Sequence, residues 1–487
     1  MAATEGKRLN IFFFPFMAHG HTIPMLDIAN LFMNRGHIST IITTPLNAPS
    51  ILSAISILGG SAGGGSVGID IKVIKFQTPE GAELPSGCEN TDFITSRKMG
   101  PEWIPKFFKA TTFLRQELES LLQESQPDCL VADAFFPWAT ATAAKFGIPR
   151  LVFHGMGFFA LSVLASLATD EPHRKVGSDS EPFLVPKLPD EIFLTRRQLP
   201  EAEKEEDEFL VSFFRDAKES EWKSFGVIVN SFCELEPTYV EHYRNTLGRK
   251  AWHIGPLSLS RQAYRGNEDS IEAHDCLKWL DWKAPDSVIY ICFGSMANFE
   301  GSQLKEIAMA LESCGQHFIW IVRKNDDDKE DWLPEGFEER TEGRGLVIRG
   351  WAPQVLILQH QAIGGFVTHC GWNSTLEGVT AGVPMVTWPV SAEQFLNEKL
   401  VTDVVKIGVR VGVEQGASYG GIVNSDAIEM AVRRLMVEDE GEEMRRRVKM
   451  LGKAAAEAVE GGSSWNDLDN LVLELQSLSP MNRCSLL

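Results

Sequence analysis

Residues 9–44 read LNIFFFPFMAHGHTIPMLDIANLFMNRGHISTIITT. An apolar run of strand length opens this stretch, and a second such run closes it. Between them, Met25, Ile28, Ala29 and Phe32 repeat apolar side chains at helical spacing. Strand, helix and strand in this order form the unit from which parallel sheets are built. The stretch therefore predicts an α/β fold.

The same alternation continues along the chain and then restarts. Further strand-like runs follow at residues 70–76, 128–136, 149–155 and 225–232. After a polar stretch around residues 258–275, a second series lies at residues 286–295, 317–322, 345–351, 362–371 and 383–390. We expect two doubly wound domains that face each other, residues 1–257 and 258–465. Residues 466–487 carry a last helical pattern, which we expect to pack back on the N-terminal domain.

The composition is that of a folded protein, and the net charge disfavours binding to nucleic acid. The chain has 487 residues, 44% of them hydrophobic and 23% charged, which suits two sizeable cores. Its formal net charge of -20 repels nucleic acid and anionic membrane surfaces. An anionic ligand would have to be held by local groups such as helix N-termini.

The cysteines and the apolar runs bear on the compartment. The eight cysteines include no C-x-x-C pair, so buried free thiols in a reducing compartment are the expectation. The apolar run at residues 9–18 is short and contains a proline, which is unlike a signal peptide. No run approaches the ~18 residues of a membrane span. We expect a cytoplasmic monomer without stable membrane insertion.

A phosphate site is predicted in FVTHCGWNSTLEGVTAG, residues 366–382. A buried strand ends at His369, turns through Gly371 and enters a helix. Free backbone N–H groups and the helix dipole make such an N-terminus suitable for a phosphate. The alternative is that Asn373, Ser374 and Thr375 only cap the helix, since these are cap residue types.

Neighbouring strand ends carry side chains suited to the rest of a nucleotide sugar. Trp351 offers a flat ring, and Glu377 a carboxylate for ribose hydroxyls. Glu393 and Gln394 follow the next strand with groups that suit sugar hydroxyls. All of them lie beyond the carboxyl ends of strands, where open α/β sheets bind ligands.

Residues 351–394 also carry a family resemblance. The run WAPQVLILQHQAIGGFVTHCGWNSTLEGVTAGVPMVTWPVSAEQ looks like the signature box of plant secondary-product UDP-glycosyltransferases, over all 44 positions. FPFMAHGHTIP, LVADAFFPWA, VNSFCELEP and YICFGS also stand where such enzymes have them. The resemblance covers essentially the whole chain and implies the GT-B fold, two Rossmann-like domains with the active site in the cleft.

The resemblance implies roles for individual residues. For UDP it implies Trp351 on uracil, Ala352 and Gln354 on the uridine, Glu377 on the ribose, and His369, Asn373, Ser374 and Ser295 on the diphosphate. For the sugar it implies Trp372, Glu393 and Gln394. Gln394 stands where some members have histidine, which favours glucose over galactose. Glu393 replaces an aspartate that is common at its position.

The transfer also needs a base, because the acceptor hydroxyl loses its proton as the new bond forms. Histidine suits that task near neutral pH. His19 and His21 both follow the first strand, and the family pattern G-H-x-x-P selects His21. Asp133 is the matching carboxylate that would orient the imidazole. The alternatives are an ordinary loop histidine and a helix-capping aspartate.

We expect no metal and no cofactor, with UDP-glucose as the donor substrate. His19 and His21 could form an H-x-H ligand pair, and Asp326–Asp328 or Asp467 with Asp469 a D-x-D motif. The triplet lies in a charge run, however, and the last pair fits the first turn of the final helix.

The acceptor is expected to be a lipophilic small molecule. Phe135, Phe136 and Phe158 are candidates for the wall of its pocket, with plain core packing as the alternative. The layout resembles the branch that glucosylates flavonoids, coumarins, triterpenoids and steroids, with inversion to a β-glucoside.

Other functions remain as alternatives. These are a transferase for another UDP-sugar, such as galactose or xylose, and a non-catalytic binding protein for nucleotide sugars or lipophiles. A nucleotide-dependent oxidoreductase is disfavoured because no G-x-G-x-x-G follows the first strand.

Overall fold

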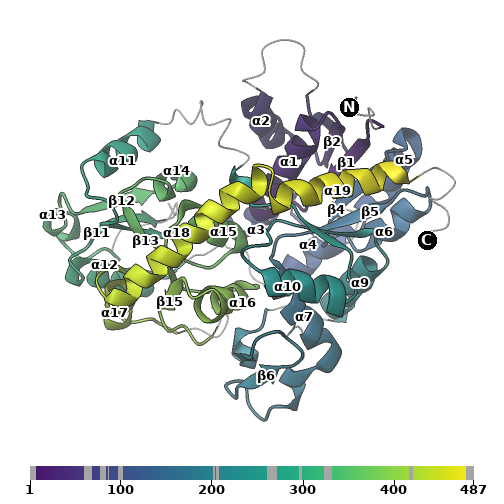
Figure 1. Cartoon of the computed structure of the whole chain (residues 1–487). Coiled ribbons are helices and arrows are strands. Elements are labelled where there is room, and N and C mark those ends of the chain that lie inside the picture. The colour runs from purple at the N-terminus through teal and green to yellow at the C-terminus, as the bar shows by residue number, and fades with distance from the viewer. Residues whose placement is uncertain are drawn as a thin grey trace.

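Two parallel sheets organise the chain (Figure 1). The computed structural model describes residues 7–478 except 60–67, 77–83, 86, 97–102, 201–202, 204–207, 260–270, 295–298, 323–331 and 416–420. Within this range, N-terminal residues build one sheet and C-terminal residues the other.

The N-terminal sheet has the strand order β3-β2-β1-β4-β5-β8-β9, and every neighbouring pair is parallel. Its strands are β1 (Asn10–Phe14), β2 (Ile38–Thr43), β3 (Asp70–Val73), β4 (Cys129–Asp133), β5 (Arg150–His154), β8 (Gly226–Val229) and β9 (Ala251–His253). The order reverses between β1 and β4, as in a Rossmann sheet.

The C-terminal sheet has the order β12-β11-β10-β13-β14-β15, again with parallel pairs. Its strands are β10 (Val288–Cys292), β11 (His317–Val322), β12 (Gly345–Arg349), β13 (Ile363–Thr368), β14 (Met385–Thr387) and β15 (Gly408–Arg410). Here the order reverses between β10 and β13. The predicted fold class of two doubly wound halves is therefore confirmed.

Helices cover both faces of each sheet. In the N-terminal half they are α1 (His19–Asn34), α2 (Ala48–Gly59), α3 (Thr91–Ser96), α4 (Trp103–Thr111), α5 (Leu114–Ser125), α6 (Trp138–Ala144), α7 (Phe158–Asp170), α9 (Glu208–Trp222) and α10 (Pro237–Glu241). In the C-terminal half they are α11 (Ile271–Asp281), α12 (Gly301–Ser313), α13 (Phe337–Arg340), α14 (Gln354–Leu358), α15 (Trp372–Ala381), α16 (Gln394–Lys399), α17 (Ser425–Met436) and α18 (Asp439–Val459). The apolar residues of α1 at positions 25, 28, 29 and 32 are all buried, because that face packs on the sheet.

Four strands were not expected from the sequence. β9 and β15 have only three residues each, too few for a periodicity to be visible. β6 (Phe183–Val185) and β7 (Ile192–Leu194) form an antiparallel pair outside both sheets. The long connection after α7 therefore contains a small hairpin.

Helix α19 (Ser463–Ser477) lies on the N-terminal half, and in Figure 1 the yellow helices α18 and α19 run from one half to the other. Leu468, Leu471, Val472 and Leu475 are buried in a cluster with residues of β1 and β4. Asp467 pairs with Arg244, and Asp469 with Arg35 at 2.9 Å. Division of the chain at residue 257 stays a prediction.

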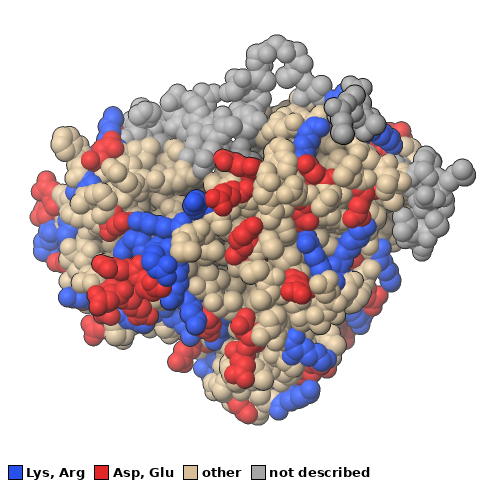
Figure 2. Space-filling view, viewed as in Figure 1, with Lys and Arg blue, Asp and Glu red and all other residues tan. Residues whose placement is uncertain are grey.

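The exposed surface mixes charges. On the face shown in Figure 2, Lys and Arg side chains lie among Asp and Glu side chains. Within the described ranges, no helix is both long and apolar enough to cross a membrane.

Candidate active site

The two points where strand order reverses hold the candidate residues. In the N-terminal sheet, His21 lies in the first turn of α1, directly after β1, and Asp133 is the last residue of β4. In the C-terminal sheet, Gly294 follows β10 and His369 follows β13. Ligands of open α/β folds bind at such switch points, because the helices diverge there and leave a crevice.

His21 and Asp133 form a hydrogen-bonded pair. The His21 Nδ1 to Asp133 Oδ2 distance is 2.7 Å, and the other carboxylate oxygen accepts the backbone N–H of Phe135 at 3.0 Å. The Asp133 side chain is fully buried, whereas that of His21 is 23% exposed. Asp133 does not cap a helix, since α6 begins only at Trp138. With Nδ1 donating to the carboxylate, Nε2 of His21 is left as the acceptor for a proton.

Two acidic residues hold the pKa of His21 above its ordinary value of 6.5. Burial alone lowers this pKa, but the charge and hydrogen bond of Asp133 raise it, as does the charge of Glu393. Glu393 belongs to the C-terminal half, so the imidazole lies within electrostatic reach of both halves.

The donor half offers a helix N-terminus. Gly371 occupies the N-cap position of α15, where no side-chain cap hydrogen bond is formed. Asn373, Ser374 and Thr375 therefore lie in the first turn and do not cap it. The N–H groups of a first turn have no intrahelical acceptor, so they can bind an anion.

His369 stands against this N-terminus as a neutral group. A Cβ atom at Gly294 would lie 2.7 Å from its ring, and one at Gly371 only 2.3 Å, so both positions require glycine. Burial lowers the pKa of His369 to about 4. Its Nδ1 is buried and has no hydrogen-bond partner among the described residues. At neutral pH it can donate one N–H to a phosphate without carrying charge.

Cys370 has a left-handed backbone between these residues. Its φ of 64° is unusual for a residue with a side chain. The Asn397 amide donates to its carbonyl at 2.9 Å and to the Glu393 carboxylate at 3.2 Å. One buried side chain of α16 thus joins the phosphate loop to the predicted sugar carboxylate.

Three of the residues predicted to bind UDP form one network. The Gln354 amide donates to Ser374 Oγ at 2.9 Å and to Glu377 Oε2 at 2.7 Å. Trp351 is 62% exposed, so a face of its ring is open for the uracil of UDP. Ala352 beside it is buried. Residues from α14 and α15 are therefore already aligned with each other.

At the sugar end, the orientation of Gln394 is fixed. Its side-chain oxygen accepts the backbone N–H groups of Val390 at 2.8 Å and Ser391 at 3.0 Å. The amide can therefore offer only its N–H side to a sugar hydroxyl. Ser295, predicted for the diphosphate, lies outside the described residues.

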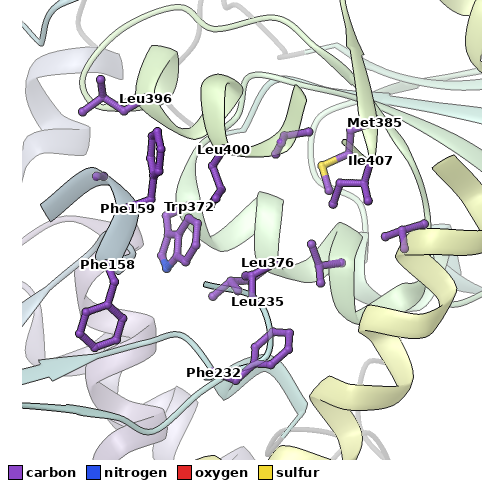
Figure 3. Packing of buried hydrophobic residues seen from close by; sticks show 14 of the residues in the cluster. Phe158, Phe159, Phe232, Leu235, Trp372, Leu376, Met385, Leu396, Leu400 and Ile407 are labelled. Carbon is purple, nitrogen blue, oxygen red and sulfur yellow. The ribbon is translucent and has the colours of Figure 1, made fainter. Parts of the chain in front are cut away.

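Trp372, predicted for the sugar, has a buried ring. The side chain is 2% exposed, and its indole N–H donates to the carbonyl of Asn230 at 2.7 Å. Figure 3 shows the ring among Phe158, Phe159 and Leu400, in the cluster that joins the two halves. Any contact with a sugar would have to come from the backbone of this residue.

The two halves meet at the site itself. Asn373 Nδ2, on the first turn of α15, donates to the carbonyl of Gly20 at 3.0 Å. Gly20 immediately precedes His21, so the first turn of α15 lies next to the candidate base.

Two aromatic rings lie beside His21. The Phe135 and Phe16 ring centroids lie 5.3 and 5.6 Å from that of the imidazole. Phe214 of α9 lies 6.2 Å from Phe135, and both rings are half-buried. Sequence reasoning missed Phe214, since only a helical repeat of phenylalanines marks it. Asn397 was missed as well, and it has no sequence signal beyond its spacing from Glu393.

The other two phenylalanines predicted for the acceptor pocket are core residues. Phe136 stacks on Phe14 with centroids 4.2 Å apart, and Phe158 packs against Tyr243 at 5.5 Å. Both have no exposed surface, so neither side chain lines open space. The core-packing alternative holds for these two.

The ligand pairs considered for a metal have other surroundings. Among the described residues, no group of three or more His, Cys, Asp and Glu side chains could hold a metal ion. Asp467 and Asp469 pair with arginines, and His21 is paired with Asp133. Asp326–Asp328 lie outside the described ranges.

Known proteins resemble the chain over nearly its full length. The family model described as "UDP-glucoronosyl and UDP-glucosyl transferase" matches residues 109–437. UDP-glucose flavonoid 3-O-glucosyltransferase 7 of Fragaria ananassa is 54% identical, over 98% of both chains. Scopoletin glucosyltransferase of Nicotiana tabacum is 53% identical, over 97% of this chain and 99% of that protein.

Solved structures agree with the fold. UGT73P12 of Glycyrrhiza uralensis, complexed with glycyrrhetinic acid 3-O-monoglucuronide, superposes with a TM-score of 0.86 at 40% identity, covering 97% of this chain and 96% of that one. Phytolacca americana UGT2, complexed with UDP-2fluoro-glucose and pterostilbene, gives 0.76 at 26% identity, over 96% and 99%. The predicted family and GT-B fold are confirmed: the chain belongs to the plant secondary-product UDP-glycosyltransferases and is an enzyme of that family.

Proposed function

We propose that the protein transfers glucose from UDP-glucose to a hydroxyl of a lipophilic small molecule, with inversion at the anomeric carbon. One observation carries the proposal. The His21–Asp133 pair lies one residue from the contact of Gly20 with Asn373, at the N-terminus of α15. A catalytic base and a diphosphate site therefore lie close enough to act on one acceptor and one UDP-sugar bound side by side.

Donor binding is assigned to the C-terminal half. Trp351 stacks on uracil, Ala352 and Gln354 fix the uridine, and Glu377 takes the ribose hydroxyls. His369, Asn373, Ser374 and the N–H groups in the first turn of α15 bind the diphosphate. We assign Ser295 to the diphosphate as well. Glu393 and Gln394 bind the glucose hydroxyls, along with the backbone of Trp372. The open Trp351 ring and the Gln354 network support this assignment.

The chemical step needs no covalent enzyme intermediate. His21 Nε2 takes the proton of the acceptor hydroxyl as its oxygen bonds to the anomeric carbon. The bond from that carbon to the diphosphate breaks, and UDP leaves with the electron pair. Asp133 stabilises the imidazolium that forms. A single displacement converts the α-linked donor into a β-glucoside.

For the acceptor, we propose a flavonoid, another phenolic compound, a triterpenoid or a steroid. The half-buried rings of Phe135, which lies beside His21, and Phe214, which lies beside Phe135, support an apolar, ring-containing substrate. The matched relatives carry flavonoid and scopoletin in their names, and the Glycyrrhiza structure holds a triterpenoid glucuronide.

We also propose a cytosolic monomer that works without metal. The seven described cysteines are free, and most are buried, which suits a reducing compartment. Light scattering on a sizing column measures the assembly state, and a fluorescent fusion reports the compartment.

The test is a panel of phenolic and terpenoid aglycones offered with UDP-glucose, UDP-galactose or UDP-xylose. Products are followed by mass spectrometry, and the anomeric coupling is read by NMR. We expect a β-glucoside and at least tenfold lower turnover with the other two donors. An α-linked product would overturn the mechanism, preference for galactose or xylose would overturn the donor, and UDP binding without turnover on any aglycone would favour a binding protein.

A further inference from the structure

Arg150 is a fully buried arginine behind the candidate base pair. It opens strand β5 and is 2% exposed. Its Nη2 donates to the carbonyl of Asp133 at 2.6 Å and more weakly to that of Ala132 at 3.4 Å. Its Nη1 donates to Thr140 Oγ1 at 2.6 Å and Ser220 Oγ at 2.7 Å. The guanidinium therefore ties the end of β4 to helices α6 and α9.

The hydrogen bonds of Arg150 do not pair its charge with an opposite charge. All four acceptors are neutral, and among the described residues no carboxylate lies within ion-pair distance of Arg150. Its Nε is buried without a hydrogen-bond partner. A buried charge without a paired counter-ion is unfavourable, and an apolar residue would fill such a place more cheaply. Burial lowers the pKa of Arg150 to about 10, against the opposing charges of Asp133 and Glu221, so it stays a cation at neutral pH.

We propose that Arg150 is a positioning residue for the transfer: it holds the strand end that carries Asp133, and its positive charge offsets the negative charge that Asp133 places on the His21 ring. The proposal rests on the proposed role of His21 as the base.

The charges around His21 explain why such an offset is useful. Burial lowers the pKa of His21, and the two groups that raise it, Asp133 from β4 and Glu393 beside α16, are both acidic. Together they favour the protonated ring, which cannot serve as a base. Arg150 adds a positive charge next to Asp133, because its guanidinium donates to the Asp133 carbonyl. Arg150 and Asp133 are both buried, so water screens this charge only weakly. With Arg150 present, His21 is free of its proton over a wider range of pH.

The experiment compares Arg150→Met, which removes the charge, with Arg150→Lys, which keeps it. Leu130→Ala is the matched control, because Leu130 is the buried register partner of Arg150 on β4 and its loss weakens packing without changing charge. The His21 imidazole is titrated by NMR on histidine-labelled protein, with its signal assigned from His21→Ala. The pH profile of kcat/KM and the KM for UDP-glucose are measured in parallel.

We expect Arg150→Met to raise the His21 titration midpoint by about 0.5 to 1 pH unit and to move the acid limb of kcat/KM by the same amount. Arg150→Lys and Leu130→Ala should leave both within about 0.2 unit. The KM for UDP-glucose should change less than twofold, since the donor residues lie in the other half. Should Arg150→Met fail to fold, Arg150→Gln replaces it with the same expected shift.

An unmoved midpoint in the uncharged variant would overturn the proposal, as would an equal shift in Leu130→Ala. Failure of the proposed function looks different. In that case His21→Ala retains activity, while the NMR titration still shows whether Arg150 acts on the ring.

Discussion

The two switch points of this enzyme have the same geometry and opposite chemistry. At the switch point of the C-terminal sheet, a helix N-terminus and His369 both offer N–H donors. Burial lowers the pKa of this histidine to about 4, so it is neutral at neutral pH. In the N-terminal sheet, the histidine is paired with Asp133 at 2.7 Å and its pKa is raised. One carboxylate within hydrogen-bond distance makes the difference. We therefore expect the histidine in one half to donate an N–H to a phosphate, and the histidine in the other half to accept a proton.

Removal of the base should have the largest effect. His21→Ala is expected to lower kcat by about 10² to 10⁴-fold, the usual contribution of general-base catalysis, because the variant lacks the imidazole that is paired with Asp133. UDP affinity, measured by calorimetry, should change less than twofold. His19→Ala is the control, since this exposed neighbour is not paired with Asp133. An alanine variant at position 21 that keeps most of its turnover would refute the contrast between the halves.

The donor half should respond in affinity and not in the chemical step. Trp351→Ala is expected to weaken UDP binding by about 10 to 100-fold, because stacking of a base on an aromatic ring contributes ~1–3 kcal/mol. At saturating UDP-glucose, kcat should stay within a few-fold. Trp282→Ala offers a control on the same half, with a ring that is 87% exposed. Equal weakening of UDP binding in both variants would mean that the Trp351 ring does not stack on the uracil.

The two histidines should also separate in pH dependence. As pH falls through the raised pKa of His21, the ring gains a proton, so kcat/KM should drop tenfold per unit on a limb that lies above pH 6.5. UDP binding should show no histidine titration between pH 5 and 8, since the pKa of His369 is about 4. Calorimetry and initial rates on the same samples measure both. A donor affinity that follows the kinetic limb would contradict the separation.

The donor half was easier to predict from sequence because its groups are local. The Gln354–Ser374–Glu377 network lies within 23 residues along the chain, so one motif contains it. Asp133 is 112 residues from His21, and the pairing depends on β1 and β4 being neighbours. Strand order of this kind is a property of the whole sheet, and here only the resemblance suggested which histidine takes part.

Side-chain direction was the part that could not be predicted. Phe135 and Phe136 are adjacent in sequence, yet Phe135 is half-buried beside His21 and Phe136 is buried against Phe14. Trp372 lies within the most recognisable motif, but its ring is buried between the halves. Apolar residues at strand ends serve the core and the pocket equally well, so composition cannot separate them.

A smaller effect is expected at the aromatic wall. Phe214→Ala should raise the acceptor KM roughly fivefold, since an aromatic contact contributes about 1 kcal/mol, and it should leave the KM for UDP-glucose unchanged. Phe113→Ala is the control, because Phe113 is 42% exposed and absent from the ring cluster beside His21. The two KM values come from one set of initial-rate measurements. A change in the KM for UDP-glucose alone would mean that Phe214 acts on donor binding and not on the acceptor.

Chelation should have the smallest effect. In the proposed donor site, the first turn of α15 and the neutral His369 would supply N–H donors for the diphosphate. A divalent cation performs that task in metal-dependent transferases. We therefore expect EDTA to change the initial rate by less than about 20%. Loss of a catalytic metal ion would lower the rate far more, since even a tenfold loss corresponds to only ~1.4 kcal/mol in the activation free energy. Enzyme dialysed against chelator and then supplied with Mg²⁺ is the paired measurement. Turnover that disappears with EDTA and returns with Mg²⁺ would show that a cation shares the leaving-group charge, so that helix and histidine alone do not account for the donor half.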